Sequence, residues 1–448
     1  MSKPSIPKGT RDFLPEQVVK RNFIFDTIRS TFIKYGFKGI ATPVMESLST
    51  LTGKYGEEGD QLLFKVLNNG DYLAKADKDA LSELDSNRLT SSISKRGLRY
   101  DLTVPFARFV VMHQNDISFP FKRYAIEPVW RADRPQKGRY QEFYQCDADV
   151  VGTDSLMCEA ELVCLMDEVF TKLDIPVSIK VNNRKVLFGI AEASGIGDKF
   201  QQFAVGIDKL DKIGQERVIQ ELVGKGLDEE KVAQALGLID TKSLSDLEGP
   251  FTSSETGRRG LEELRSFHEY LDAVGHKNEV VFDATLARGL SYYTGCIFEV
   301  KAKNAEMGSI AGGGRYDDLT GVFGLKDVSG VGISFGAERI YDIMEEKDLF
   351  PSSALRTSKA IVLGMDAEAH VEAFRITTEL RRNGIDVDCY PSAAKFKKQM
   401  KFANQGNYPF AIIIGKEEMD TESLIVKNMT VGGQVRTKLE ELIIEWKD

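Results

Sequence analysis

The segment FKRYAIEPVWRADRPQKGRYQEFYQCDADVV, from Phe121 to Val151, decides the fold of this chain. It contains two runs suited to β-strands, Arg123 to Trp130 and Gln141 to Val151, joined by a turn rich in Arg, Pro and Gly. This pattern predicts a pair of neighbouring strands. Side chains alternate along a strand, so Phe143, Gln145, Asp147 and Asp149 share one face of the second strand, and Tyr144, Cys146, Ala148 and Val150 form an ordinary core face.

The loop between the two strands concentrates positive charge. Arg131, Arg134, Lys137 and Arg139 lie within nine residues. Two strands joined by such a loop suit a phosphate chain, with the aromatic ring of Phe143 for a base and the carboxylates for a cationic or hydrogen-bonding substrate. The alternative is a sheet face that simply meets solvent.

Three further clusters of candidate site residues lie between residues 288 and 339. They are RGLSYYTG (288–295), GGGRYD (312–317) and GISFGAER (332–339). The first pairs a guanidinium with two phenols, or is a strand end with surface tyrosines. The second allows close approach of a ligand or a neighbouring strand. In the third, Arg339 can contact an anion or pair with Glu338.

The spacing of apolar residues and the local composition predict how the chain is divided into segments. Heptad-like apolar spacing at Val18, Phe25, Ile28 and Phe32 predicts a helix over 16–35, followed by a strand over 38–44. Residues 74–97 are polar and are expected to form an exposed, mobile insertion. We expect a catalytic core over 1–183 and 277–350, interrupted by a mostly helical insertion over 184–276.

The C-terminal part, 355–448, alternates predicted strands and helices. Strands are expected at 359–364, 385–390 and 410–415, and helices at 367–383, 395–405 and 436–446. Such alternation predicts a small α/β domain with a mainly parallel sheet. A lysine cluster at Lys395, Lys397, Lys398 and Lys401 is either a solvated helix face or a contact for nucleic acid.

Composition and net charge limit the partners and the cellular location that the chain is expected to have. The chain has 448 residues, and its net charge of −9 argues mildly against nucleic acid as a partner. Residues 355–448 carry 14 basic and 14 acidic side chains, so that whole excess lies on residues 1–354. Five cysteines without metal-binding spacing, and no apolar run of membrane-spanning length, favour a cytoplasmic protein with no membrane association.

The motifs, taken in order, resemble the histidyl-tRNA synthetase family of class II aminoacyl-tRNA synthetases. The resemblance rests on KGTRDFLP, GIATP, LRYDLTVPFAR, VWRADRPQKGRYQEFYQCDAD, LARGLSYYTG, AGGGRYDDL and GVGISFGAER. It implies an α+β catalytic domain with an antiparallel sheet and flanking helices, a helical insertion and a C-terminal α/β anticodon-binding domain. It also implies a homodimer.

The resemblance further implies an activity and a set of site residues. Histidine would react with ATP, which enters with Mg²⁺, to give histidyl-adenylate and pyrophosphate, and histidine would then pass to the 3′ end of tRNA(His). ATP would contact Arg131, Arg139, Phe143 and Arg339, with Arg131 and Arg288 as the catalytic residues. L-histidine would contact Asp101, Leu102, Thr103, Arg131, Gln145, Asp149, Arg288, Tyr292 and Tyr293, and tRNA would contact Gln136.

Two positions depart from the family pattern. Ser291 stands where the family usually has an acid, and Gln141 stands where bacterial members often have an arginine. The main alternative to a ligase is the histidine-sensing regulatory subunit of ATP phosphoribosyltransferase, a non-catalytic paralogue. Such paralogues typically lose the C-terminal domain, whereas this chain keeps residues 355–448.

Overall fold

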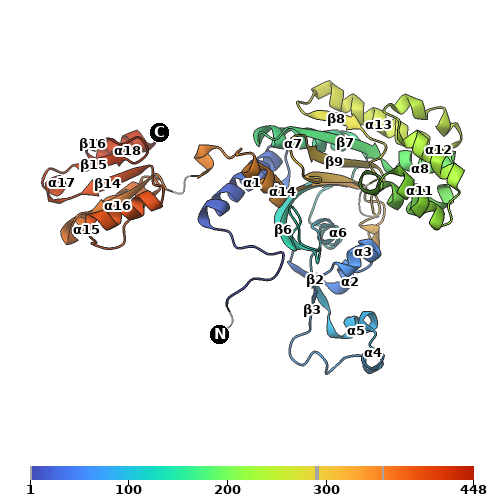
Figure 1. Ribbon diagram of the computed structural model, residues 1–448, viewed down its shortest axis with the longest axis horizontal. Helices are drawn as coiled ribbons and strands as arrows, with labels where there is room; N and C mark the ends of the chain where they lie inside the picture. The colour runs from blue at the N-terminus through green and yellow to red at the C-terminus, as the bar shows by residue number, and fades with distance from the viewer. Residues whose placement is uncertain (1–2, 288–291, 356–357, 448) are drawn as a thin grey trace. The chain divides into compact units, whose positions relative to one another are not determined.

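The computed structural model describes residues 3–287, 292–355 and 358–447. The chain divides into two compact units, the first formed by Met1–Asp12 and Arg21–Leu349, the second by Phe13–Lys20 and Phe350–Asp448. Each unit has its own sheet and core (Figure 1).

The first unit is built on a large, mostly antiparallel sheet. Its two edge pairs, β1 with β5 and β7 with β8, are parallel, and the pairs between them are antiparallel. The strands follow the order β1 (Lys38–Gly39), β5 (Phe121–Trp130), β6 (Glu142–Val151), β11 (Gly330–Gly336), β10 (Ala311–Tyr316), β9 (Cys296–Ala302), β7 (Val177–Asn183) and β8 (Glu279–Phe282). The predicted strand pair of 123–151 is therefore confirmed as β5 and β6.

Helices α1 (Pro15–Lys34) and α7 (Met157–Lys172) cover one face of this sheet. Their rings Phe32 and Phe170 lie 6.0 and 5.5 Å from the ring of Phe335 on β11. α14 (Ala337–Glu346) follows β11 directly and packs against β6. The helix predicted over 16–35 is confirmed, although its buried face runs through Ile24, Ile28 and Phe32, and Val18 is exposed.

The opposite face of the sheet carries α6 (Thr103–Met112) and a small sheet of β2 (Met45–Ser47), β4 (Arg96–Leu98) and β3 (Lys65–Val66). The strand expected over 38–44 is wrong in extent. It is divided into β1, which pairs with β5 in the large sheet, and β2, which pairs with β4 in the small sheet; Pro43, which cannot donate a ladder hydrogen bond, lies between them. Short helices α2 (Leu48–Leu51) and α3 (Gly56–Gln61) follow.

The polar segment 74–97 is more regular than its composition predicted. It forms α4 (Lys78–Ser82) and α5 (Ser86–Ile93), whose first turns are capped by the carboxylates of Asp77 and Asp85. Arg88 lies within ion-pair distance of both Asp77 and Glu83. Local capping and charge pairing thus replace an apolar core in organising this segment.

Residues 184–274 are helical, as expected, and lie beside β7 and β8 in Figure 1. α13 (Glu255–Val274) packs along α8 (Arg184–Ala193). A Cβ on Gly260 would lie 2.8 Å from the backbone nitrogen of Val186, so the close approach of the two helices requires glycine at this position. The helices are α8 (Arg184–Ala193), α9 (Phe200–Ile207), α10 (Leu210–Ile213), α11 (Gln215–Gly224), α12 (Glu229–Ile239) and α13 (Glu255–Val274), with short 3₁₀ turns between some of them.

The second unit is an α/β domain whose sheet has the order β13-β12-β14-β15-β16. The expected mainly parallel sheet is wrong, because β14, β15 and β16 pair antiparallel. The last two strands form a hairpin that the sequence pattern did not predict. The elements are β12 (Ala360–Gly364), α15 (Ala367–Arg382), β13 (Val387–Cys389), α16 (Phe396–Gln405), β14 (Phe410–Ile414), α17 (Lys416–Asp420), β15 (Leu424–Asn428), β16 (Gln434–Thr437) and α18 (Leu439–Lys447).

No helix within the described ranges is long and apolar enough to cross a membrane.

Candidate active site

A cavity of about 310 Å³ opens on the α6 side of the large sheet. Its walls come from β6, β9, β10 and β11, from the loop between β5 and β6, and from the starts of α6 and α14. The lining residues are Asp101, Thr103, Arg131, Asp133, Gly138, Arg139, Tyr140, Phe143, Gln145, Tyr292, Tyr293, Phe298, Ser309, Ile310, Ala311, Gly312, Gly313, Ser334, Gly336, Glu338 and Arg339.

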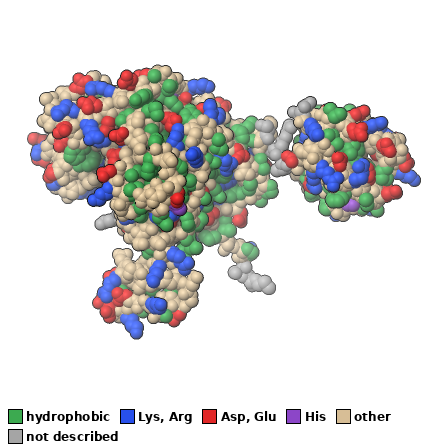
Figure 2. Space-filling view, turned by 180° about the vertical axis from the view of Figure 1, so that it is seen from behind, with side chains coloured by type: hydrophobic (Ala, Val, Ile, Leu, Met, Phe, Trp, Pro, Cys, Tyr) green, Lys and Arg blue, Asp and Glu red, His purple; other side chains and the backbone are tan. Residues whose placement is uncertain are grey.

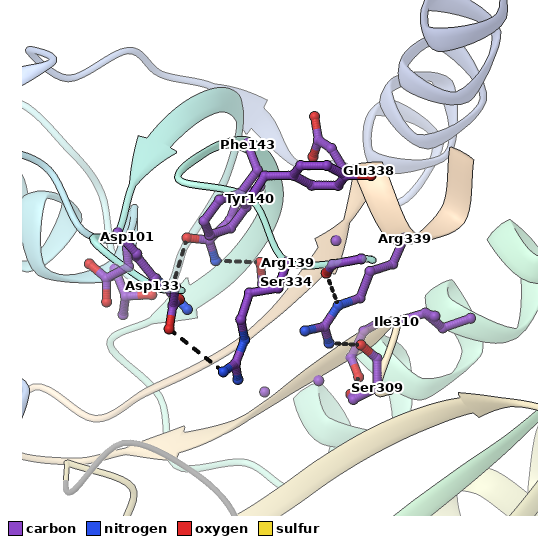
Figure 3. A pocket seen from close by; sticks show the side chains of 18 of the residues that line it. Asp101, Asp133, Arg139, Tyr140, Phe143, Ser309, Ile310, Ser334, Glu338 and Arg339 are labelled. Atoms are coloured by element: carbon purple, nitrogen blue, oxygen red, sulfur yellow. Dashed lines mark hydrogen bonds and ion pairs between the residues drawn. The ribbon is translucent and has the colours of Figure 1, made fainter. Parts of the chain in front are cut away.

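One end of the cavity is cationic. In Figure 3 the side chains of Arg139 and Arg339 both extend into the open space beneath the loop. Arg139 lies 3.7 Å from the carboxylate of Asp133 and is half-exposed. Arg339 is fixed by donating to the backbone carbonyls of Gly138, at 2.8 Å, and Ser309. Two guanidinium groups at one mouth suit the distal phosphates of a nucleotide.

Arg131 occupies the middle of the cavity. Its Nε donates to the carbonyl of Tyr100 at 3.0 Å, and its NH2 group lies 3.4 Å from Oε1 of Gln145. Its guanidinium stacks 4.2 Å from the ring centroid of Tyr100 and 5.2 Å from that of Phe143. Stacking and backbone contacts on the Nε side hold the charge in place while the rest of the group faces the cavity.

The opposite end is acidic and buried. Asp101 sits just before α6, and its Oδ1 accepts from the phenol of Tyr55, at 3.0 Å, and from the amide of Val104. Its Oδ2 is buried without a hydrogen-bond partner within the described chain. Burial raises the pKa of this carboxyl group. An unsatisfied buried acceptor at a cavity wall suits a ligand with an ammonium group.

Asp149 lies beneath the acidic end. Its Oδ2 is 2.7 Å from NH2 of Arg123, and its Oδ1 accepts from the phenol of Tyr316 at 2.6 Å. Asp147, on the same face of β6, is 3.9 Å from the same guanidinium. Burial, with the neighbouring Asp149, raises the pKa of Asp147 to about 7, against the opposing effect of Arg123. Burial also raises the pKa of Asp149.

Glycines on the adjacent strands make room for this group. A Cβ on Gly332, which pairs with Asp149 across β11 and β6, would lie 1.9 Å from Oδ1 of that carboxylate. A Cβ on Gly313 would lie 2.0 Å from the carbonyl oxygen of Gly332. Both distances are far below van der Waals contact, so these positions admit no side chain without movement of the backbone.

Tyr292 and Tyr293 close the acidic end from the side. Their rings are 4.9 Å apart and nearly edge to face, and burial raises the pKa of both phenols. Arg288 and Ser291, both singled out from the sequence, lie outside the described residues.

The structure brings most of the sequence-predicted residues together. Asp101, Thr103, Arg131, Arg139, Phe143, Gln145, Tyr292, Tyr293 and Arg339 line the cavity. Three others differ. Leu102 is buried in a small core cluster with Ala125 and Val129, and Asp149 is buried behind the lining. Gln136 is exposed on the loop, paired with the backbone of Arg139.

Several residues of the site were not predicted. Glu338 was considered as a partner of Arg339, but it accepts from Arg21 of α1 and from the amide of Tyr144, both at 2.9 Å. Ser334 and Ser309 are ordinary strand and loop residues in the sequence. Asp133 and Tyr140 flank the arginines of the loop, and that adjacency was the one signal available for them.

Gln141, the departure in the loop, does not line the cavity. Its amide donates to the carbonyl of Asp133 at 3.0 Å, and its backbone nitrogen donates to the carbonyl of Gly9 at 2.8 Å. A Cβ on Gly9, whose φ is +77°, would lie 2.6 Å from Cγ of Gln141. Gln141 therefore anchors the N-terminal segment to the base of the loop.

A mostly antiparallel sheet that carries an arginine-rich loop, a cationic end and a buried acidic end, with a separate α/β unit after it, is the arrangement of a class II aminoacyl-tRNA synthetase.

Comparison with known proteins narrows this class. The family model described as histidyl-tRNA synthetase matches residues 71–340, and the anticodon binding domain matches residues 359–447. A protein of Bacteroides fragilis named histidine–tRNA ligase is 53% identical over 447 residues, covering 99% of this chain and 98% of its own. One of Porphyromonas gingivalis, with the same name, is 53% identical over 439 residues, covering 97% of each.

A solved structure agrees. The histidyl-tRNA synthetase of Nostoc sp. PCC 7120 superposes with a TM-score of 0.84 at 28% identity, covering 100% of this chain and 99% of its own. The chain belongs to the histidyl-tRNA synthetase family. The relatives named as ligases span both units, which favours the ligase over the regulatory-subunit alternative.

Proposed function

We propose that the cavity binds ATP and L-histidine side by side, and that the chain joins them as histidyl-adenylate before transferring histidine to the 3′ end of tRNA(His). The observation that carries the proposal is the polarity of one continuous cavity. Arg139 and Arg339 lie at one end, Asp101 and the buried Asp149 lie at the other, and Arg131 lies between them.

At the cationic end, Arg139 and Arg339 contact the distal phosphates, and the ring of Phe143 stacks on adenine. ATP enters with Mg²⁺, which neutralises part of the phosphate charge. Arg131 contacts the α-phosphate together with the histidine carboxylate. Because its guanidinium is already fixed by Tyr100, it stabilises the charge that develops on the α-phosphate without reorganising.

At the acidic end, the histidine amino group binds to Asp101, Thr103 and Gln145. Asp101 offers Oδ2, whose hydrogen-bonding capacity is otherwise unused within the described chain. The imidazole is read by Asp149 with Tyr292 and Tyr293. A site built around buried polar groups discriminates strongly, since an analogue without the ring nitrogens leaves those groups unpaired.

The reaction needs mainly positioning and charge stabilisation. The histidine carboxylate oxygen attacks the α-phosphorus of ATP, the new P–O bond forms, and the bond to the pyrophosphate oxygen breaks. Arg131 spans both reactants at that point. Arg288 is assigned a role at the α-phosphate by the family resemblance alone. In the second step the terminal ribose hydroxyl of tRNA displaces AMP from the adenylate.

Two further partners belong to the proposal. The second unit would contact the tRNA anticodon region, and Lys397, Lys398 and Lys401 of α16 are exposed for phosphate contacts. In Figure 2 the Lys and Arg side chains of that unit lie among its Asp and Glu side chains. A second copy of the chain would cover the α1–β2 region, where Ile33, Val44 and Met45 are exposed. A mass measurement in solution tests this, with a monomer at micromolar concentration as the contradicting result.

The direct test of the whole function is aminoacylation. The purified chain, ATP, Mg²⁺, radiolabelled histidine and tRNA(His) should give acid-precipitable histidyl-tRNA. Arg131→Met should lose the signal while keeping the fold, as judged by its thermal unfolding profile. Histidine that is bound but never transferred would support the regulatory-subunit alternative.

A further inference from the structure

Arg123 lies in the middle of β5 and does not line the cavity. It is fully buried, with its guanidinium packed 4.4 Å from the ring centroid of Phe106. Its NH2 group donates to the carbonyl of Leu102 at 3.2 Å and lies 2.7 Å from Oδ2 of Asp149. Arg123 and Asp149 are direct partners in the β5–β6 register, so the strand pairing itself brings them together.

This contact holds the Asp149 carboxylate from one side. Tyr316 holds it from the other, through the 2.6 Å hydrogen bond to Oδ1. The hydrogen bond at Oδ1 and the ion pair at Oδ2 together oppose rotation of the carboxylate, because rotation would break a buried charge-assisted contact. Oδ2 accepts no hydrogen bond within the described chain, so it can accept an imidazole N–H in a fixed direction.

The same guanidinium connects to the rest of the site through Asp147. Ser334 is the register partner of Asp147 across β11 and β6, and its hydroxyl accepts from Nε2 of Gln145 at 2.7 Å. Gln145 in turn contacts Arg131, with its Oε1 3.4 Å from the NH2 group of that guanidinium. A row of neighbouring polar side chains therefore runs from Arg131 through Gln145, Ser334 and Asp147 to Arg123, behind the cavity.

We propose that Arg123 is a positioning residue for histidine selection, which fixes the Asp149 carboxylate against Tyr316 so that the imidazole meets a preoriented acceptor. This rests on the proposed function, in which Asp149 reads the imidazole. The competing role for Arg123 is purely structural. One guanidinium serves two buried carboxylates, and a buried charge without compensation destabilises the fold.

Charge-balanced variants separate the two roles. Arg123→Met alone leaves two buried carboxylates uncompensated. Arg123→Met with Asp147→Asn removes one positive and one negative charge, so at pH 8, above the raised pKa of Asp147, the net charge of the group equals that of the wild type. Arg99→Met is the matched control, because Arg99 is equally buried beside β4 but pairs with Glu127 at 2.7 Å and does not line the cavity.

The measurement is ATP–pyrophosphate exchange, with KM determined separately for histidine and for ATP. The balanced double variant should raise KM for histidine by at least about tenfold, since a lost preoriented charged contact is worth that much or more, and leave KM for ATP within about threefold. Arg99→Met should change the two KM values by the same small factor. Arg123→Lys keeps the positive charge but loses the planar guanidinium with its fixed set of donors, and it should raise KM for histidine by about threefold or more.

Two results would overturn the proposal. A balanced double variant with wild-type KM for histidine would show that Arg123 only balances charge. If that variant does not fold, Arg123→Lys with wild-type KM for histidine would show the same. Asp149→Asn tests the assumption that Asp149 contacts the imidazole. If this variant leaves KM for histidine unchanged, the assignment of Asp149 is itself wrong, and not only the role given to Arg123.

Discussion

Arg123 and Asp149 face each other across β5 and β6, with NH2 and Oδ2 2.7 Å apart and both side chains buried. The pair lies behind the acidic end of the cavity, whose other end Arg139 and Arg339 make cationic. In the proposed function, amino-acid recognition and most of the phosphate contacts would thus depend on β5, β6 and the loop between them, with Arg339 added from α14.

The first prediction concerns Arg139. Arg139→Met should raise KM for ATP by roughly 10- to 100-fold, because a charge-assisted phosphate contact contributes on the order of 1.5–3 kcal/mol. KM for histidine should change little. Arg134→Met is the control: Arg134 lies on the same loop but is exposed and does not line the cavity. Equal effects of the two variants on pyrophosphate exchange would contradict the assignment.

The second prediction concerns Gly332. Gly332→Ala places a Cβ against Asp149 Oδ1, so the carboxylate or β11 has to move. KM for histidine should rise by about tenfold or more, and thermal stability should fall, since overpacking costs roughly 1–3 kcal/mol. Gly237→Ala on α12, where a Cβ has open space, should leave both quantities near the wild-type values. Wild-type histidine binding by Gly332→Ala would show that the carboxylate is not held there.

The third prediction is a pH dependence of folding. Burial raises the pKa of Asp147 to about 7, above its unfolded value near 3.8. The folded state therefore binds a proton that the unfolded state has released, and stability falls as pH rises through this window and levels off above it. Asn mimics the protonated form. Asp147→Asn should thus gain unfolding free energy relative to wild type by roughly 2 kcal/mol between pH 5 and pH 8.

Chemical denaturation of both proteins at pH 5, 6, 7 and 8 checks this. The difference should grow with pH and level off near pH 8. A constant difference across the series would mean that Asp147 stays ionised in the folded protein down to pH 5.

The fourth prediction concerns the lysines of the second unit. Lys395, Lys397, Lys398 and Lys401 lie at the start of and along α16, where Lys397, Lys398 and Lys401 are exposed. Replacing all four by Gln should raise KM for tRNA(His) at least about tenfold at physiological salt and reduce its salt dependence, because each phosphate contact releases counterions. Pyrophosphate exchange without tRNA should be unaffected. Arg375→Gln with Arg382→Gln, on α15, gives a control for general loss of charge.

The arrangement of β5 and β6 was predictable from the sequence, because alternation alone puts Phe143, Gln145, Asp147 and Asp149 on one face. The partners of those side chains were not predictable in the same way. Arg123 lies 26 positions before Asp149 in the chain, and only the strand register shows that they meet.

Other features of the structure could not be predicted, mostly because they depend on contacts between residues far apart in the sequence. Glu338 is adjacent to Arg339, yet it pairs with Arg21, which is brought to it by the packing of α1. The hairpin of β15 and β16 was missed because β16 is a short, exposed edge strand with little apolar alternation. The helices of 74–97 depend on aspartate caps, a signal weaker than the polar composition around them.

The central claim is that the cavity of the first unit activates histidine. ATP–pyrophosphate exchange with each of the twenty amino acids, without tRNA, tests it most directly. We expect exchange with histidine alone, and its loss in Arg131→Met. Histidine binding without any exchange would contradict the claim and favour a histidine-sensing protein built on the same fold.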